Sequence, residues 1–73
     1  MGKNITCEVV QALAVLSAAG AYEKQVNLIS WNGADPVVDI RVWNTETGKA
    51  GKGLTIKPDE VPALIEALQR QQA

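Results

Sequence analysis

Arg41 and Trp43 are the residues whose types and spacing most directly suggest a binding chemistry. They lie in a segment of strict alternation, residues 37–43, which predicts a strand with two unlike faces. One face is aliphatic and carries three side chains: Val38, Ile40 and Val42. A tryptophan and an arginine on the opposite, open face suit stacking on bases and pairing with phosphates. The alternative is that Trp43 packs into a subunit interface while Arg41 neutralises Asp39 or Glu46.

Trp31 ends the preceding predicted strand, directly before the turn residues Asn32 and Gly33. A second exposed aromatic ring at the rim of a sheet would lengthen a stacking platform. The alternative is a tryptophan that caps the hydrophobic core. Tyr22, at the start of the same strand, is weaker evidence for a platform.

Residues 47–53 place Lys49 and Lys52 in a glycine-containing loop. This segment is not a phosphate-binding P-loop, because that motif requires glycine five residues before Gly51, where this chain has Glu46. A flexible basic loop can close over a nucleic-acid backbone. The alternative is a solvated hairpin loop.

Catalytic and metal-binding constellations are missing from the sequence. Histidine is absent, which excludes Ser/His and Cys/His relays and the common zinc sites. The single cysteine, Cys7, is expected to be a small buried side chain in an apolar strand. Asp35, Asp39 and Glu46 form no convincing pair of acid and base. We therefore expect a protein that is not an enzyme and uses no metal or other cofactor.

The net charge of −1 argues mildly against a nucleic-acid ligand, but the charges are unevenly distributed. The segment from Val37 to Lys57 holds more basic than acidic residues, whereas the tail from Pro58 onward is mainly acidic. The basic residues of that segment are Arg41, Lys49, Lys52 and Lys57. A folded molecule with this pattern can have a basic side and an acidic side.

Four strands and one helix are expected to position these residues. The strands are predicted at residues 5–17, 22–31, 37–43 and 52–57, separated by turns or loops at 18–21, 32–36 and 45–51. The first run also has the length and alanine content of a helix, and its β-branched residues favour a strand. The sequence leaves open which face of the second strand is buried.

A helix is predicted to begin at residue 59 or 60, because Pro62 fits only in a first turn and Asp59 and Glu60 suit a helix N-terminus. Its apolar stripe consists of Val61, Leu64, Ile65 and Leu68. If this stripe meets the aliphatic face of residues 38–42, Arg41 and Trp43 point away from the helix; we assign the stripe to the dimer interface. The predicted fold class is α+β, a four-stranded antiparallel sheet followed by one C-terminal helix.

The length of 73 residues allows one domain, spanning residues 1–73, with a small interior. One cysteine permits no internal disulfide, so self-association is the expected source of added stability. A hydrophobic content of 47% fits a subunit interface, and we predict a homodimer. The sequence has neither a membrane span nor a signal-peptide pattern, and an unpaired cysteine fits the reducing cytoplasm.

Several segments combine into a recognisable pattern. The strand Val37-Val38-Asp39-Ile40-Arg41-Val42-Trp43 is followed by a loop, then by Gly51-Lys52-Gly53-Leu54-Thr55-Ile56 and Pro58-Asp59-Glu60. In this order they resemble the C-terminal domain of the positive-cofactor-4 family of transcriptional coactivators. Ser30-Trp31-Asn32 and Val15-Leu16-Ser17 are similar to its small bacterial YdbC-like branch.

The resemblance implies a dimer whose helices pair at the interface and whose curved sheets bind single-stranded DNA largely independently of sequence, in transcription, replication or repair. It implies nucleic-acid contacts by seven residues: Lys24, Trp31, Asn32, Arg41, Trp43, Lys49 and Lys52. RNA is an alternative ligand. Asp35 and Leu28 replace positions that are often basic in relatives, so binding weaker than the family norm is expected. The alternative function is a dimeric protein-interaction module that has lost nucleic-acid binding.

Overall fold

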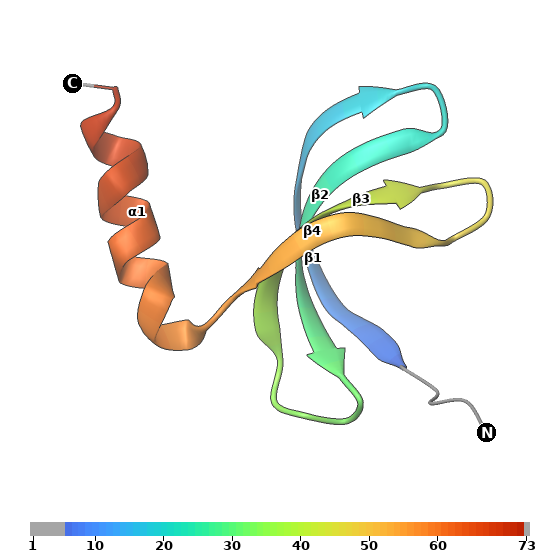
Figure 1. The fold of residues 1–73 in the computed structure, drawn as a ribbon, viewed down its shortest axis with the longest axis horizontal. Helices are drawn as coiled ribbons and strands as arrows, with labels where there is room; N and C mark the ends of the chain where they lie inside the picture. Colours follow the sequence, from blue (N-terminus) through green and yellow to red (C-terminus); the bar gives the residue numbers. More distant parts are fainter. Residues whose placement is uncertain (1–5, 73) are drawn as a thin grey trace.

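The computed structural model describes residues 6–72 and contains four strands and one C-terminal helix (Figure 1). The elements are β1 (Cys7–Ala19), β2 (Tyr22–Trp31), β3 (Val37–Asn44), β4 (Ala50–Ile56), a 3₁₀ turn η1 (Pro58–Glu60) and α1 (Val61–Arg70). The predicted order is confirmed, and the bounds of β2 are those predicted. β4 begins two residues earlier than expected, and the predicted start of the first strand at Ile5 lies outside the described residues.

The strands form one antiparallel sheet in the order β1-β2-β3-β4. Consecutive strands pair because each connection is short and contains a residue in the left-handed region of backbone space. These residues are Gly20, Asn32 and Gly33, and Gly48, with φ values of 59°, 52°, 79° and 76°. Glycine adopts this conformation without strain, and asparagine is among the side chains that tolerate it best.

The register gives the sheet two unlike faces. Gln25 of β2 lies opposite Arg41 of β3, and Asp39 lies opposite both Asn27 of β2 and Thr55 of β4. We call the side that carries them the tryptophan face; its other members include Glu23, Ile29, Trp31 and Trp43. The opposite side is the aliphatic face, formed by Val26, Leu28, Val38, Ile40, Val42, Leu54 and Ile56. The alternation predicted for residues 37–43 is therefore confirmed.

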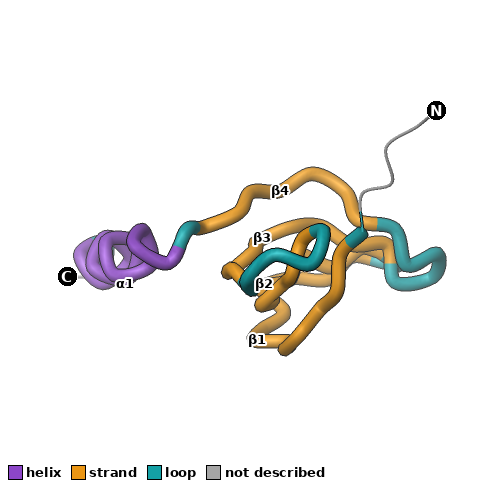
Figure 2. The backbone as a smooth tube through the Cα atoms, turned by 90° about the horizontal axis from the view of Figure 1, so that it is seen from below, coloured by secondary structure: helices purple, strands orange, loops and turns teal. Residues whose placement is uncertain are grey.

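Burial is concentrated on the tryptophan face. Ile29 and Asp39 are completely buried there and Asn27 is 3% exposed, whereas Ile56 is the buried member of the aliphatic face. Figure 2 shows that the sheet is strongly curved, with β4 and β1 at opposite ends of the curve. Because side chains crowd on the inner side of a curved sheet, we assign the tryptophan face to the inner side. This answers the question that the sequence left open for β2.

β1 reaches its full length through three bulges. Its pairing with β2 shifts register between Val9 and Gln11, Ala12 and Ala14, and Val15 and Ser17. The residues without a partner are Val10, Leu13 and Leu16, which are 50%, 47% and 57% exposed. Each bulge adds one residue to the outer strand and increases its bend. Cys7, at the start of β1, is exposed, so the expectation of a buried thiol is wrong: β1 is an edge strand that no other described element covers.

α1 does not cover the aliphatic face of its own sheet. α1 stands clear of the sheet (Figures 1 and 2), and Ile65 and Leu68 of its apolar stripe are 50% and 56% exposed. The reason is local. Lys57 is the single residue between β4 and η1, and the following Pro58 favours its extended backbone (φ −69°, ψ 154°), so the chain leaves the sheet without folding back.

Pro62 lies in the first turn of α1, as predicted, but α1 begins at Val61 and not at residue 59 or 60, which belong to η1. The preceding 3₁₀ turn is closed reciprocally: the Glu60 carboxylate accepts a 2.8 Å hydrogen bond from the Lys57 N–H, and the Glu60 N–H donates to the Lys57 carbonyl at 2.8 Å. As in a capping box, the Glu60 carboxylate satisfies a backbone N–H at the start of the helical segment. Within residues 6–72, no helix is long and apolar enough to span a membrane.

Candidate nucleic-acid interface

An ion pair lies at the centre of the tryptophan face. Arg41 donates from Nε to Asp39 Oδ1 at 2.9 Å and from Nη2 to Oδ2 at 2.8 Å, which is a bidentate pair across one face of β3. Thr55 Oγ1 of β4 donates to Asp39 Oδ2 at 3.2 Å. The Asp39 side chain is fully buried and that of Arg41 is 17% exposed. Of the two acidic partners considered for Arg41 from the sequence, Asp39 is the one that it contacts in the structure.

The guanidinium of Arg41 also makes a third hydrogen bond, to the backbone of β4. Nη1 donates to the Gly51 carbonyl at 3.0 Å. Gly53 lies directly opposite Arg41, and a Cβ at this position would overlap the Ile40 carbonyl and lie 2.6 Å from the Arg41 Cα. The hydrogen bonds to Asp39 raise the pKa of Arg41 above its ordinary value despite partial burial, so this residue stays cationic at any working pH.

Trp31 lies under this guanidinium. The Arg41 Cζ is 5.2 Å from the centroid of the Trp31 ring, which is a cation–π distance. Both Trp31 and Trp43 are partly buried, and neither indole N–H has a hydrogen-bond acceptor among the described residues. The two rings are therefore neither fully exposed nor fully part of the core. They border the polar side chains at the centre of the tryptophan face, which we call the polar floor.

The polar floor includes a ladder along β2 that the sequence interpretation missed. Gln25 Nε2 donates to Glu23 Oε1 at 2.8 Å, and Asn27 Nδ2 donates to Gln25 Oε1 at 2.9 Å. Glu23 lies opposite Trp43 in the register, so the ladder runs from one tryptophan toward the other. Polar residues at every second position from 23 to 27 were the available signal, and without the register they could not be assigned to a face.

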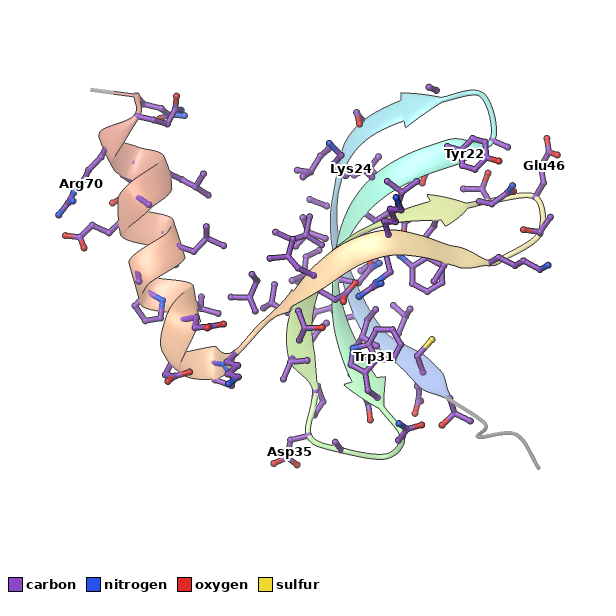
Figure 3. The ribbon with its side chains drawn as sticks, viewed as in Figure 1. Tyr22, Lys24, Trp31, Asp35, Glu46 and Arg70 are labelled. Carbon is purple, nitrogen blue, oxygen red and sulfur yellow. The ribbon has the colours of Figure 1, made fainter. Side chains whose placement is uncertain are left out.

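Lys24 and Lys52 lie on the aliphatic face, away from the two tryptophans. Lys24 is opposite Val42, and both lysines line a hollow of about 210 Å³ with Ile40 and Leu54. Figure 3 shows Lys24 and Trp31 on opposite sides of the strands. The predicted set of contact residues is thus divided between two faces of one sheet.

Lys49 and Asn32 lie in connections at the two ends of the sheet. Lys49, in the β3–β4 loop, is exposed and borders a hollow of about 370 Å³ together with Tyr22 and Asn44. The Asn32 side chain is already engaged, because its Oδ1 accepts a 2.9 Å hydrogen bond from the Thr6 N–H. Its structural role is to tie the start of β1 to the β2–β3 connection.

The part of the chain that the structure describes contains no cluster of three or more residues able to hold a metal ion. Comparison with known proteins gives two matches. The family model described as Transcriptional Coactivator p15 (PC4) matches residues 21–67, a segment that includes all seven predicted contact residues. An uncharacterised protein of Treponema pallidum (strain Nichols) is 37% identical over 62 residues, covering 84% of this chain and 73% of that protein.

Proposed function

The chain belongs to the PC4 family, a family of non-catalytic DNA-binding proteins, and from this premise we propose that it binds single-stranded DNA on the tryptophan face as a homodimer. The binding supports transcription, replication or repair by holding transiently opened DNA. The observation that carries the proposal is the placement of Trp31 and Trp43 on one inner face with a cationic, polar floor between them.

The spacing of the two tryptophans supports a ligand of several nucleotides. Trp43 lies opposite Glu23, eight positions from Trp31 along β2. At about 3.3 Å per residue this is roughly 26 Å, measured along the strand. The sheet curves toward this face, and Arg41, the neighbour of Trp43 on this side of β3, reaches to 5.2 Å from the Trp31 ring. The two rings are therefore closer together than the path along β2, and a short single strand can contact both of them.

The basic residues contribute in unequal ways. Arg41 has three of its N–H groups engaged by Asp39 and Gly51, so its main role is to support Trp31, with its remaining N–H groups available to a phosphate. Lys49 projects from the exposed β3–β4 loop at the rim. Lys24 and Lys52 contact phosphates of the bound DNA where it leaves the tryptophan face and passes to the aliphatic face of the sheet.

The homodimer is proposed from the apolar surface that one chain leaves uncovered. Among the described residues, Ile29 and Ile56 are the buried hydrophobic side chains, and the apolar residues of β1 and α1 are about half exposed. A chain of this size with so small a core is expected to be marginal alone. The proposed interface is the α1 stripe, Val61, Leu64, Ile65 and Leu68.

The experiment is a fluorescence titration with a roughly 20-nucleotide oligo-dT at low and moderate salt, beside a duplex of the same length and oligo-U. We expect saturable tryptophan quenching that weakens with salt and favours the single strand. Equal binding of oligo-U would widen the ligand to RNA. No quenching at low salt would refute the proposal and favour a dimeric protein-interaction module.

A further inference from the structure

Asp39 is an acidic residue in the middle of a face proposed to bind a polyanion. A carboxylate there disfavours phosphates, and three hydrogen bonds, two from Arg41 and one from Thr55, keep it completely buried. Asp39 therefore reduces the electrostatic attraction of this face for a nucleic acid, and we look for a role that offsets this loss. The residues that it holds indicate what that role is.

Asp39 restricts Arg41, a side chain that otherwise has many rotamers. The bidentate pair fixes the plane of the guanidinium, and the third bond to the Gly51 carbonyl at 3.0 Å fixes its position along β4. The guanidinium carbon then lies 5.2 Å from the Trp31 ring centroid. The Trp31 indole N–H makes no hydrogen bond within residues 6–72, so Arg41 is the polar group that supports this ring.

We infer that Asp39 is a positioning residue: it holds Arg41 against one side of the Trp31 ring, so that the ring is already oriented to stack a base on its other side. Thr55 belongs to the same device, because its hydroxyl holds the second oxygen of Asp39. Orientation before binding lowers the entropy that is lost when the base stacks. This inference rests on the proposed function.

The test is Asp39→Asn, measured by the anisotropy of fluorescein-labelled oligo-dT so that the reading does not depend on tryptophan emission. The substitution changes the net charge from −1 to 0, and electrostatics alone therefore predicts tighter binding. Positioning predicts binding weaker by about three- to tenfold, a part of the stacking energy of one base, with an unchanged salt dependence. The matched control is Glu46→Gln, which makes the same change of charge in an exposed loop and is expected to bind equally well or more tightly.

A cycle with Trp31→Ala separates positioning from general damage to the fold. Asp39→Asn should weaken binding in the wild-type background and have no further effect when Trp31 is alanine, because the ring that it positions is absent. Equal weakening in both backgrounds, or binding as tight as wild type by Asp39→Asn, would overturn the inference. Failure of the wild-type protein to bind would instead overturn the proposed function.

If Asp39→Asn does not fold, as judged by circular dichroism, Arg41→Lys tests the same arrangement. Lysine retains the charge but lacks the planar fork that pairs with Asp39 and covers the ring. We expect a similar three- to tenfold loss of affinity with an unchanged salt dependence. Wild-type affinity of a folded Arg41→Lys protein would refute the positioning role.

Discussion

Leu68→Ala is expected to weaken the dimer without weakening the helix. Leu68 lies on the apolar stripe of α1 and is 56% exposed in the single chain. Because alanine has the highest helix propensity, the substitution does not disfavour α1 itself. A change in assembly would therefore report on the surface of the stripe.

The magnitude follows from the exposed fraction. Complete burial of a leucine side chain contributes about 1.5–3 kcal/mol, so covering the remaining half and subtracting the methyl group that alanine keeps leaves about 1 kcal/mol per copy. Because the stripe occurs twice in a dimer, the substitution should weaken the free energy of association by about 2 kcal/mol. This raises the dissociation constant of the dimer by roughly 30-fold. Folding coupled to assembly also makes the Tm depend on protein concentration, and Leu68→Ala should lower the Tm most in dilute samples.

Leu16→Ala is the matched control, since Leu16 is 57% exposed and lies in a bulge of β1. The assay is sedimentation velocity over a wide concentration range, together with thermal unfolding at its two ends. If Leu16→Ala weakens the dimer as much as Leu68→Ala, the interface lies elsewhere. If the wild-type chain is a monomer whose Tm does not depend on concentration, the reasoning from the small core is refuted.

Three further outcomes follow from the sheet. Gly53→Ala should lower the free energy of unfolding by roughly 1–3 kcal/mol, measured by thermal unfolding, because the added Cβ would overlap the backbone of β3. Gly51→Ala is the control and should cost less, since its Cβ would lie 3.2 Å from the nearest atom, the Val42 carbonyl oxygen. Equal effects of the two substitutions would contradict this geometry. Lys52→Ala should reduce the slope of log affinity against log salt by about 0.7, and an unchanged slope would show that Lys52 meets no phosphate. Trp43→Ala should weaken oligo-dT binding by about 1–3 kcal/mol in anisotropy titrations, and unchanged affinity would remove this ring from the stacking platform.

The parts of the fold that depend on local pattern could be predicted from the sequence. The alternation of residues 37–43 gave the faces of β3, and Pro62 located the first turn of α1. The direction of α1 could not be predicted in the same way. An apolar stripe shows that a helix must be covered but not by which surface, and the extended Lys57 carries it away from its own sheet.

The candidate site was only partly predictable for a similar reason. Trp31, Arg41 and Trp43 do share a face, but Lys24 lies on the other one, because a single step in strand parity reverses the side of a residue. In β1, apolar residues at positions 10, 13 and 16 imitate helical spacing. Each occupies a bulge, which explains why periodicity did not distinguish a strand from a helix there.

The bulges of β1 also bear on whether other chains can pair with the edge of the sheet. An apolar strand at the edge of a sheet offers unpaired backbone groups to other chains and is a common starting point for aggregation. β1 has 13 residues against the 10 of β2, and its three bulges interrupt the outer edge at nearly regular intervals. An edge strand of another chain could pair with only short stretches of β1, because each bulge interrupts the regular backbone hydrogen bonding. The same irregularity that bends β1 around the sheet thus protects an exposed, hydrophobic edge from uncontrolled strand addition.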